Sequence, residues 1–355
     1  SQTLIENTDF FATTLNITNP NTTVRNCNFI YPSCYSFMID KLDTESDIID
    51  NTPLSDSITE PIFNNMTKVK ADNCTFQNCT FMYTDGSAIE MIGDLNTIDG
   101  CLFHHIDKTC ANLSSIMTSI RMHGDNNVFS NNTIYKTGAS ATINCGNAAL
   151  IEYNDIYDTG YLQSDGAMIK CMVNQQPNTV ISFNWLHDSI KYGARFDGDG
   201  EGHSGYIHHN VCWNVEGGIM VKGGIKVKDG NIDDTGETVG GHYVYNNTCF
   251  NSNGKNDIIA LNVQGDHQIN NGTLVFNNLA NIISGHRTKE DDVLGEQINP
   301  EISDPKNYES VDLSGLLENV ENNDFRPKPV SETPVNSDII EQGLEIPIAG
   351  FTPPS

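Results

Sequence analysis

Residues 206–224, YIHHNVCWNVEGGIMVKGG, contain the repeating unit that decides the fold. A short alternating strand (YIHH) leads into an asparagine, and a second short strand and a glycine-rich turn follow it. The same order of residues recurs without gaps in five further segments: SNNTIYKTG (130–138), EYNDIYDTG (152–160), SFNWLHDSI (182–190), YNNTCFNSNG (245–254) and VFNNLANI (275–282). The aligned asparagines of the six copies are Asn132, Asn154, Asn184, Asn210, Asn247 and Asn278.

The spacing of these asparagines is typical of a solenoid. A unit of ~22 residues or more, with two or three short strands and an asparagine at one corner, is one coil of a parallel β-helix. We expect the corner asparagine to adopt left-handed backbone geometry and its amide to bond to the asparagines of the adjacent coils. Weaker copies surround Asn26 and Asn78. The sequence therefore predicts an all-β protein, a right-handed parallel β-helix over residues 1–290, with the handedness taken from known folds.

The repeat is lost from about residue 291 onwards. The segment NPEISDPKNYESVDLSG is rich in proline and acidic residues and shows no further copy of the unit. We expect residues 291–355 to form an irregular tail that packs along the β-helix and has no core of its own.

The charge balance of the chain excludes one class of partner. The 355 residues include 19 Lys and Arg against 46 Asp and Glu, which gives a formal net charge of −27. This excludes nucleic acid as the main partner, because phosphate neutralisation needs a basic surface. No apolar run approaches the ~20 residues of a membrane span, and we expect that any signal peptide is absent or already removed. We expect a monomeric bacterial protein that is secreted or at the cell surface, in the periplasm or outside the cell.

The ten cysteines fall into three groups. Cys212 and Cys249 lie two residues after a repeat asparagine, an inward position, and are expected to be stacked core thiols. Cys145 and Cys171 are expected to be neighbours, as thiols or as a bridge. The pairs that are close enough in sequence for local disulfides, none of which we assign, are Cys27 with Cys34, Cys74 with Cys79 and Cys101 with Cys110.

A second set of strands follows the glycines and carries the polar residues of interest. Aligning RMHGD, TINCG, MIKCM, RFDGD, MVKGG and LNVQG predicts the column His123, Asn144, Lys170, Asp197, Lys222 and Asn262. Two residues earlier on the same face the alignment gives Arg121, Thr142, Met168, Arg195, Met220 and Ala260. Adjacent coils lie ~4.8 Å apart, so Lys170, Arg195, Asp197 and Lys222 should form one patch. Such a cationic patch on an acidic protein favours an anionic ligand, and a simple salt-bridged ladder is the alternative.

Two kinds of polysaccharide cleavage are compatible with this patch. Glycoside hydrolysis needs two carboxyl groups, for which Asp165 and Asp197 are the candidates. Elimination from a uronate needs a base and a cation that neutralises the substrate carboxylate, for which Lys170 or Lys222, with Arg195, are the candidates. Further residues expected to contact substrate are Lys222, His203, His208, His242, Tyr243 and Glu201.

The segment DGDGEG (197–202) places Asp197, Asp199 and Glu201 two residues apart, as at the start of a calcium loop. The twelfth position is His208 instead of glutamate, which excludes an EF-hand. We expect that no cofactor is required and that these three residues form either a Ca²⁺ site or a tight glycine-rich turn. A zinc site would need histidine ligands from three coils.

The chain resembles the bacterial right-handed β-helix carbohydrate-active enzymes over roughly residues 16–283. The resemblance lies in SDGAMIKC, NTVISFNWLHDS, YGARFDGDGEG, YIHHNVCWNVEGGIMVKG and GHYVYNNTCFN. The strand ending at Asp197 is similar to family 141 glycoside hydrolases, which implies Asp165 and Asp197 as the acids. The stacked Lys and Arg residues with GGIMVKG are more weakly similar to the alginate lyase and chondroitinase B family. That similarity implies Lys170 as base and Arg195 one coil later, beside Ca²⁺.

Taken together, the sequence predicts an enzyme that degrades an anionic polysaccharide, containing uronate or sulfate groups. Hydrolysis by Asp165 and Asp197 is the first hypothesis, with Lys170, Arg195 and Lys222 binding the substrate charge. The alternatives are a polysaccharide lyase that uses Lys170 or Lys222 and Arg195, and a non-catalytic glycan-binding or structural β-helix.

Overall fold

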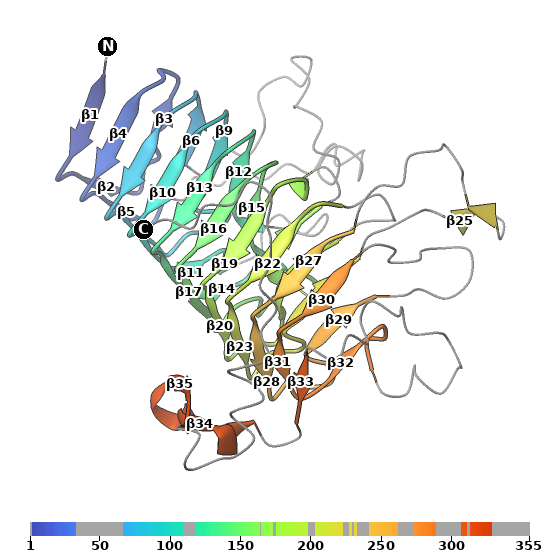
Figure 1. The fold of residues 1–355 in the computed structure, drawn as a ribbon. Helices are drawn as coiled ribbons and strands as arrows, with labels where there is room; N and C mark the ends of the chain where they lie inside the picture. The colour runs from blue at the N-terminus through green and yellow to red at the C-terminus, as the bar shows by residue number, and fades with distance from the viewer. Residues whose placement is uncertain are drawn as a thin grey trace.

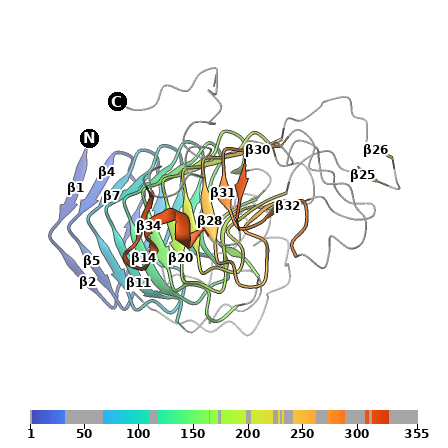
Figure 2. The ribbon, with the colours of Figure 1, turned by 60° about the horizontal axis from the view of Figure 1, so that its bottom comes forward.

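The computed structural model is a parallel β-helix built from three long parallel sheets. It describes residues 2–32, 67–108, 118–163, 165–172, 175–197, 203–222, 227–228, 231–232, 241–261, 273–288, 307–310 and 313–328. Each coil contributes one strand in turn to sheets A, B and C, so strands that are adjacent in a sheet come from successive coils (Figure 1). In Figure 2 the coils follow one another from the blue N-terminal end to the orange coils near the C-terminal end.

The strands are short, as the repeat predicts. Sheet A consists of β1 (Thr3–Glu6), β4 (Thr22–Arg25), β7 (Thr75–Gln77), β10 (Thr97–Asp99), β13 (Val128–Ser130), β16 (Leu150–Glu152), β19 (Val180–Ser182), β22 (Tyr206–His208), β27 (Tyr243–Tyr245) and β30 (Leu274–Phe276). Sheet B consists of β2 (Asp9–Phe11), β5 (Asn28–Ile30), β8 (Thr80–Met82), β11 (Leu102–Ile106), β14 (Thr133–Thr137), β17 (Asp155–Tyr157), β20 (Trp185–His187), β23 (Val211–Trp213), β28 (Thr248–Phe250), β31 (Leu279–Ala280) and β33 (Tyr308–Glu309). Sheet C consists of β3 (Asn16–Ile17), β6 (Thr67–Lys70), β9 (Ile89–Ile92), β12 (Thr118–His123), β15 (Ala141–Cys145), β18 (Ala167–Cys171), β21 (Tyr192–Phe196), β24 (Ile219–Val221), β29 (Ile258–Ala260) and β32 (Ile283–Ser284).

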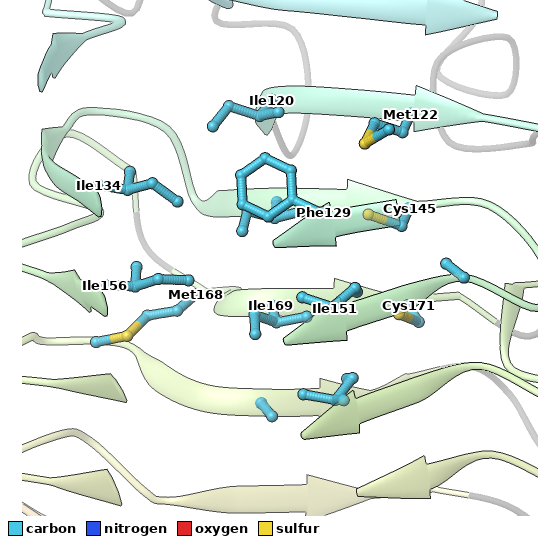
Figure 3. Close-up of a cluster of buried hydrophobic side chains, with 14 of the residues drawn as sticks. Ile120, Met122, Phe129, Ile134, Cys145, Ile151, Ile156, Met168, Ile169 and Cys171 are labelled. Atoms are coloured by element: carbon cyan, nitrogen blue, oxygen red, sulfur yellow. The ribbon is translucent and has the colours of Figure 1, made fainter. Parts of the chain in front are cut away.

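The core lies between the three sheets and is built from like side chains stacked coil on coil. Alternate residues of each strand point inward, so in-register pairing places one aromatic or branched residue above another. The rings of Phe29 and Phe81 stack with centroids 4.5 Å apart, and those of Phe81 and Phe103 with centroids 4.8 Å apart. Figure 3 shows the next stretch of the core, where isoleucines from β12 to β18 lie above one another beside Cys145 and Cys171. All these side chains are removed from solvent.

The predicted asparagine ladder is present at the corner between sheets A and B. Asn184 illustrates the pattern: its Oδ1 accepts hydrogen bonds from the backbone and side-chain amides of Asn154, at 3.0 and 2.9 Å. Its own Nδ2 donates to Asn210 Oδ1 at 2.9 Å and to the carbonyl of Ile151 at 3.0 Å. The ladder continues past Asn278 to Asn307, beyond the boundary expected near residue 290.

Two details of this corner differ from the expectation. The left-handed residue is the one before the ladder asparagine, and the ladder asparagines themselves are not left-handed. The residues in this position, with φ between 55° and 57°, are Asn131, Tyr153, Phe183, His209, Asn246 and Asn277. Asn26 and Asn78 occupy this left-handed position, and the residues after them, Cys27 and Cys79, take the place of the ladder asparagine. The Cys79 N–H donates to Cys101 Sγ at 3.4 Å, so thiols continue the ladder in the first coils.

The cysteines that the structure describes are buried free thiols: Cys27, Cys74, Cys79, Cys101, Cys145, Cys171, Cys212 and Cys249. Cys212 and Cys249 are in register on β23 and β28, as predicted. The considered pair of Cys74 and Cys79 is therefore not a disulfide, and Cys145 and Cys171 are thiols. Cys34 and Cys110 lie outside the described residues.

The segment after residue 306 packs on the outer face of sheet B. Strand β33 extends sheet B by pairing with β31. It is followed by η3 (Ser314–Leu316), β34 (Leu317–Asn319), η4 (Val320–Asn322) and β35 (Asp324–Pro327), with β34 and β35 antiparallel. Leu313 and Leu317 are buried in a cluster with Trp213 and Phe250, and the Phe325 ring lies 4.6 Å from that of Trp213. A second antiparallel pair, β25 (Val227–Lys228) with β26 (Asn231–Ile232), projects from the coils in Figure 1.

Candidate functional site on sheet C

Strands β18 and β21 are neighbours in sheet C and place two cations in register. Lys170 pairs with Arg195, while Ile169 and Cys171 on either side of Lys170 point into the core. The sequence alignment paired Lys170 with Asp197 and was wrong by two residues at this step. A shift of two residues keeps every side chain on its own face of the sheet, so the alternation of apolar residues cannot detect it.

The rest of the predicted column is partly correct. Phe196 pairs with Val221, so Asp197 and Lys222 are neighbours as expected. In the earlier coils, Arg121 pairs with Asn144, where His123 was expected. Asn262 lies outside the described residues.

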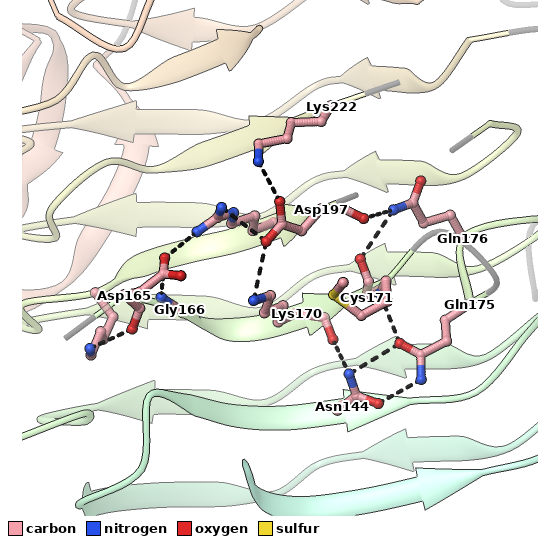
Figure 4. A network of polar contacts seen from close by, with 12 residues as sticks. Asn144, Asp165, Gly166, Lys170, Cys171, Gln175, Gln176, Asp197 and Lys222 are labelled. Carbon is pink, nitrogen blue, oxygen red and sulfur yellow. Dashed lines mark hydrogen bonds and ion pairs between the residues drawn. The ribbon is translucent and has the colours of Figure 1, made fainter. Parts of the chain in front are cut away.

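Asp197 lies at the centre of a cluster of three cations (Figure 4). Its Oδ2 is 3.1 Å from Lys170 Nζ and 2.9 Å from Arg195 Nη2, and its Oδ1 is 2.7 Å from Lys222 Nζ. Lys170, Arg195 and Asp197 are 4–6 % exposed. We call Lys170, Arg195, Lys222 and Asp197 the cation cluster.

A second carboxylate contacts the same guanidinium. Asp165 Oδ1 lies 2.7 Å from Arg195 Nη1, and 49 % of the Asp165 side chain is exposed. The Gly166 N–H donates to this Oδ1 at 2.7 Å. Gly166 has φ +102°, and a Cβ there would lie 2.1 Å from the carbonyl oxygen of Ser140. Only glycine therefore fits beside Asp165.

The loop that carries Asp165 is held by a buried lysine. Lys191 is 2 % exposed, and its Nζ donates to the carbonyls of Gln163 and Asp165, the latter at 2.6 Å. The Ser140 N–H donates to Gln163 Oε1 at 3.0 Å. These bonds fix the position of Asp165 relative to sheet C.

Both carboxyl groups are held in their ionised form. Burial by itself raises the pKa of Asp197, but Arg195, Lys170 and Lys222 outweigh burial and bring that pKa well below its ordinary value. For Asp165, partial burial is likewise outweighed by Arg195, so its pKa is lowered. The pKa of Arg195 is lowered by burial but raised on balance by Asp197 and Asp165.

Polar side chains behind the cluster hold the ends of its strands, as Figure 4 shows. Asn144 Nδ2 donates to the Lys170 carbonyl at 3.1 Å and to Gln175 Oε1 at 3.0 Å. Gln176 Nε2 donates to the carbonyls of Cys171 and Asp197, at 3.1 and 2.6 Å, and so ties the two coils together. Sequence reasoning missed both glutamines. The signal was the pair of amides in QQP directly after the Lys170 strand.

One donor of the cluster has no partner. Arg195 Nε is buried and makes no hydrogen bond in the described part of the chain, although both terminal nitrogens of the same guanidinium are engaged. The Arg195 Cζ lies 5.8 Å from the centroid of the Tyr192 ring, within range of a cation–π contact. A buried donor without an acceptor is unfavourable, so this N–H is suited to an acceptor from a ligand.

His242 is a structural residue at the corner between sheets C and A. It is fully buried, its Nδ1 accepts from the Gly205 N–H at 3.2 Å, and its Nε2 lies 3.2 Å from the carbonyl of Lys222. Burial lowers the pKa of His242 to about 3, so the ring is neutral and Nε2–H is the donor to Lys222. In this position its ring is closed to substrate.

Two other predicted substrate contacts lie on sheet A, away from the cation cluster. His208 is on β22 and stacks on Tyr245, with ring centroids 4.8 Å apart, and burial lowers its pKa to about 4. Tyr243 is on β27 and stacks on Tyr206 at 5.0 Å. His203 is half-buried at the corner that follows Asp197, with Nδ1 3.0 Å from Ser204 Oγ.

The calcium hypothesis has little support from Asp197. Both of its oxygens contact cations, which disfavours a divalent ion beside them. Asp199 and Glu201 lie outside the described residues. Elsewhere in the described chain, no three His, Cys, Asp or Glu side chains converge as a metal site would require.

Comparison with known proteins agrees with the architecture. Residues 64–231, which include Lys170, Arg195, Asp197 and Lys222, match the model of a family described as the right-handed beta helix region. With its three parallel sheets, the protein is an all-β right-handed parallel β-helix. Neither a curated protein nor a solved structure matches the chain. The described part of the chain has no helix with the length and hydropathy needed to cross a membrane.

Proposed function

We propose that the protein binds an anionic polysaccharide at the cation cluster and cleaves it by β-elimination beside a uronate carboxylate. The observation that carries the proposal is the convergence of Lys170, Arg195 and Lys222 from three successive coils. Right-handed β-helices include polysaccharide-degrading enzymes and also non-catalytic proteins, so the argument must come from the site.

The charge of the site favours an anionic substrate. Three cations face the two carboxylates of Asp165 and Asp197, so the site carries a local charge of +1 in a chain with a net charge of −27. Asp165 is half exposed and bonds to Arg195 Nη1, so it holds a place that a substrate carboxylate can take. The unpartnered Arg195 Nε supplies a further donor.

The ionisation of the two aspartates does not favour hydrolysis. A glycosidase needs one carboxyl group that stays protonated to donate to the leaving oxygen. The pKa values of both Asp165 and Asp197 are lowered, so neither is suited to that role near neutral pH. The hydrolase hypothesis therefore has less support than the lyase hypothesis, whose Lys170 and Arg195 are in register.

Elimination needs only groups that the cluster has. Arg195 and Lys222 neutralise the uronate carboxylate, which makes the hydrogen on C5 more acidic. Lys170 first gives its own proton to solvent; its amine then takes the proton from C5, the C5–H electron pair forms the C4–C5 double bond, and the C4–O bond breaks. The departing oxygen takes a proton from water. The products are a new chain end and an unsaturated uronate.

Incubation with a panel of uronate-containing, sulfated and neutral polysaccharides tests the proposal, reading reducing ends and ultraviolet absorbance together. We expect both signals to rise on a uronate polymer and to be lost in Lys170→Met and Arg195→Gln. Arg25→Ala, which removes an exposed arginine of the first coils, should behave as wild type. Reducing ends without a rise in ultraviolet absorbance would favour hydrolysis over elimination. No product on any polymer would favour a binding or structural role.

The proposed function also implies a location outside the cytoplasm. A polysaccharide too large to enter a cell requires an enzyme that is secreted or at the cell surface, and we propose that it acts there as a monomer. Fractionation of the producing cells, with detection by antibody, tests this placement.

A further inference from the structure

A second basic site lies at the corner between sheets B and C, three coils wide and outside the cation cluster. A cavity of about 260 Å³ opens there, lined by Lys108, Lys136, Gly138, Tyr161 and Leu162. Lys108 follows β11, Lys136 is on β14, and the other two side chains follow β17. None of these residues has a part in the chemistry proposed above.

The two lysines of this cavity lack carboxylate partners. No ion pair joins Lys108 or Lys136 to an acidic group of the described chain, although acidic residues outnumber basic ones by 46 to 19. Lys108 Nζ instead lies 5.9 Å from the centroid of the Tyr161 ring. Their field also reaches His105, whose pKa is lowered by burial and then by Lys108 and Lys136, with Asp158 opposing them. Two cations at one opening, neither of them in an ion pair, favour an anion.

The cavity also presents apolar surface. Tyr161 is 47 % exposed and Leu162 is 50 % exposed. Leu162 packs against Gly138, where a Cβ would lie 3.0 Å from Leu162 Cδ1 and 2.0 Å from the carbonyl oxygen of Asp107. Cations beside an exposed ring and a methyl group match an acidic sugar, which has a carboxylate or sulfate on a ring with apolar faces.

One loop connects the cavity to the cation cluster, because Leu162 lines the cavity and Asp165 bonds to Arg195. Leu162 and Asp165 are three residues apart, and the bonds from Lys191 hold the loop between them. The cavity therefore lies toward the N-terminal coils from Arg195, at a fixed position relative to it. A polymer that extends from the cluster in this direction reaches the two lysines.

We infer that Lys108, Lys136, Tyr161 and Leu162 form a distal subsite for an acidic sugar of the same polysaccharide chain. The inference rests on the proposed function for the identity of the ligand. It predicts that long acidic chains bind more tightly than short ones, through contacts that take no part in bond cleavage.

Equilibrium binding of fluorescently labelled oligogalacturonates of two lengths tests the subsite, measured in the cold directly after mixing. The double variant Lys108→Ala, Lys136→Ala should bind the long chain about tenfold more weakly. Each lysine contributes about threefold, as an exposed charge pair does, and the two factors multiply. Binding of the short chain at the cation cluster should not change. Lys70→Ala removes an exposed lysine of β6 that does not line the cavity, and should bind both as wild type does.

The outcomes separate this inference from the proposed function. Equal affinity of wild type and the double variant for the long chain, or no binding of that chain by wild type, would overturn the subsite. Reduced affinity of the double variant in a protein that cleaves no polymer would uphold the subsite and overturn the lyase. If the protein cleaves, the double variant should raise KM on the polymer and leave kcat unchanged.

Discussion

Asp165 and Asp197 bond to different terminal nitrogens of Arg195, and their surroundings give them different roles. Asp165 is half exposed on a loop, whereas Asp197 is enclosed by cations. Substitution of Asp165 therefore tests binding of the substrate, and substitution of Asp197 tests stability of the fold.

Removing Asp165 should strengthen binding of an anionic sugar. In Asp165→Ala, Arg195 Nη1 is free for a substrate carboxylate, and we expect affinity for a uronate oligosaccharide to rise about threefold, as for a partly exposed pair. Asp125→Ala removes the same charge at an exposed turn and serves as control. Isothermal titration measures both. A loss of turnover by several orders of magnitude in Asp165→Ala would instead assign this residue to hydrolysis.

Removing Asp197 should destabilise the protein. Asp197→Asn leaves three cations without their buried anion, and breaking such a pairing costs ~3 kcal/mol. Because the folded pKa is lowered, the stabilisation is present above the ordinary pKa near 4 and is lost as pH falls through the folded value. Urea unfolding near pH 7 and near pH 3 should therefore show the larger difference between wild type and variant at pH 7 and a smaller difference at pH 3, where Asp197 is still ionised in the folded protein. Equal stability at both would contradict a structural role for this carboxylate.

His242 makes the fold sensitive to acid. It is buried and neutral with a pKa of about 3, whereas the unfolded chain binds a proton near pH 6.5. Stability is thus lost between these two pH values as pH falls, by up to a few kcal/mol. In His242→Asn the amide oxygen can accept the Gly205 N–H, as Asn127 accepts from Asn96. The Tm of the variant should fall less than that of wild type as the pH is lowered from 6.5 towards 3. An equally steep fall of Tm would refute a role for His242 in acid sensitivity.

At the scale of the element, the left-handed corner positions show which residues the solenoid requires. At the corner before sheet A the residues with φ near 55° in successive coils are mostly asparagine: Asn21, Asn73, Leu95, Asn126, Ala148, Asn178 and Ser204. Leu95 departs from this pattern, with φ 58° and 56 % of its surface exposed. A branched aliphatic residue is strained there, and its side chain contributes little packing.

Leu95→Asn should therefore stabilise the protein by ~1 kcal/mol. The new amide also comes next to Asn73, whose Nδ2 already bonds to Asn21 Oδ1 at 2.6 Å in the coil before. Leu4→Asn serves as the matched control, because Leu4 is 51 % exposed on β1 and is absent from the left-handed positions. Chemical denaturation measures both variants. A destabilised Leu95→Asn would show that the corner does not select for asparagine.

The repeat was predictable because its signal is carried by residues whose chemistry is specific. An asparagine that both donates and accepts along the stack recurs in each coil from Asn132 to Asn278, so this part of the ladder could be identified from the sequence. The pairing of Lys170 with Arg195 could not, because a shift of two residues changes neither face nor apolar pattern. Lys191 and Gln176 act through backbone carbonyls, and Gln175 bonds to the Asn144 side chain and the Met172 N–H. None of these partners follows from the type of residue alone. Cys27, Cys79 and Cys101 in the ladder were missed because thiols do not resemble amides.

At the scale of the whole molecule, β33 attaches the C-terminal segment to sheet B by strand pairing, and residues 313–328 are held to the coils through one apolar contact region on the same sheet. Phe325 lies 4.6 Å from Trp213, and its ring is also 5.9 Å from those of Trp185 and Phe250. Phe325→Ala should weaken this contact by ~2 kcal/mol and expose the segment to protease.

Limited proteolysis with mass spectrometry measures that exposure. Cleavage after residue 307 should be faster in Phe325→Ala than in wild type, with the coils intact. Arg326→Ala changes the exposed neighbour, whose pair with Asp324 is at the surface, and should be cleaved at the wild-type rate. Unchanged cleavage in Phe325→Ala would show that the segment is held by β33 alone.

The same contact gives the protein a built-in optical reporter. The chain has two tryptophans, Trp185 and Trp213, and both touch Phe325. Trp213 is 5 % exposed and stacks on His187 at 4.1 Å, while Trp185 is 39 % exposed. Tryptophan fluorescence therefore reports on one small region of a long molecule. A red shift of its emission will report departure of the C-terminal segment, and circular dichroism will be needed to see whether the coils themselves have come apart.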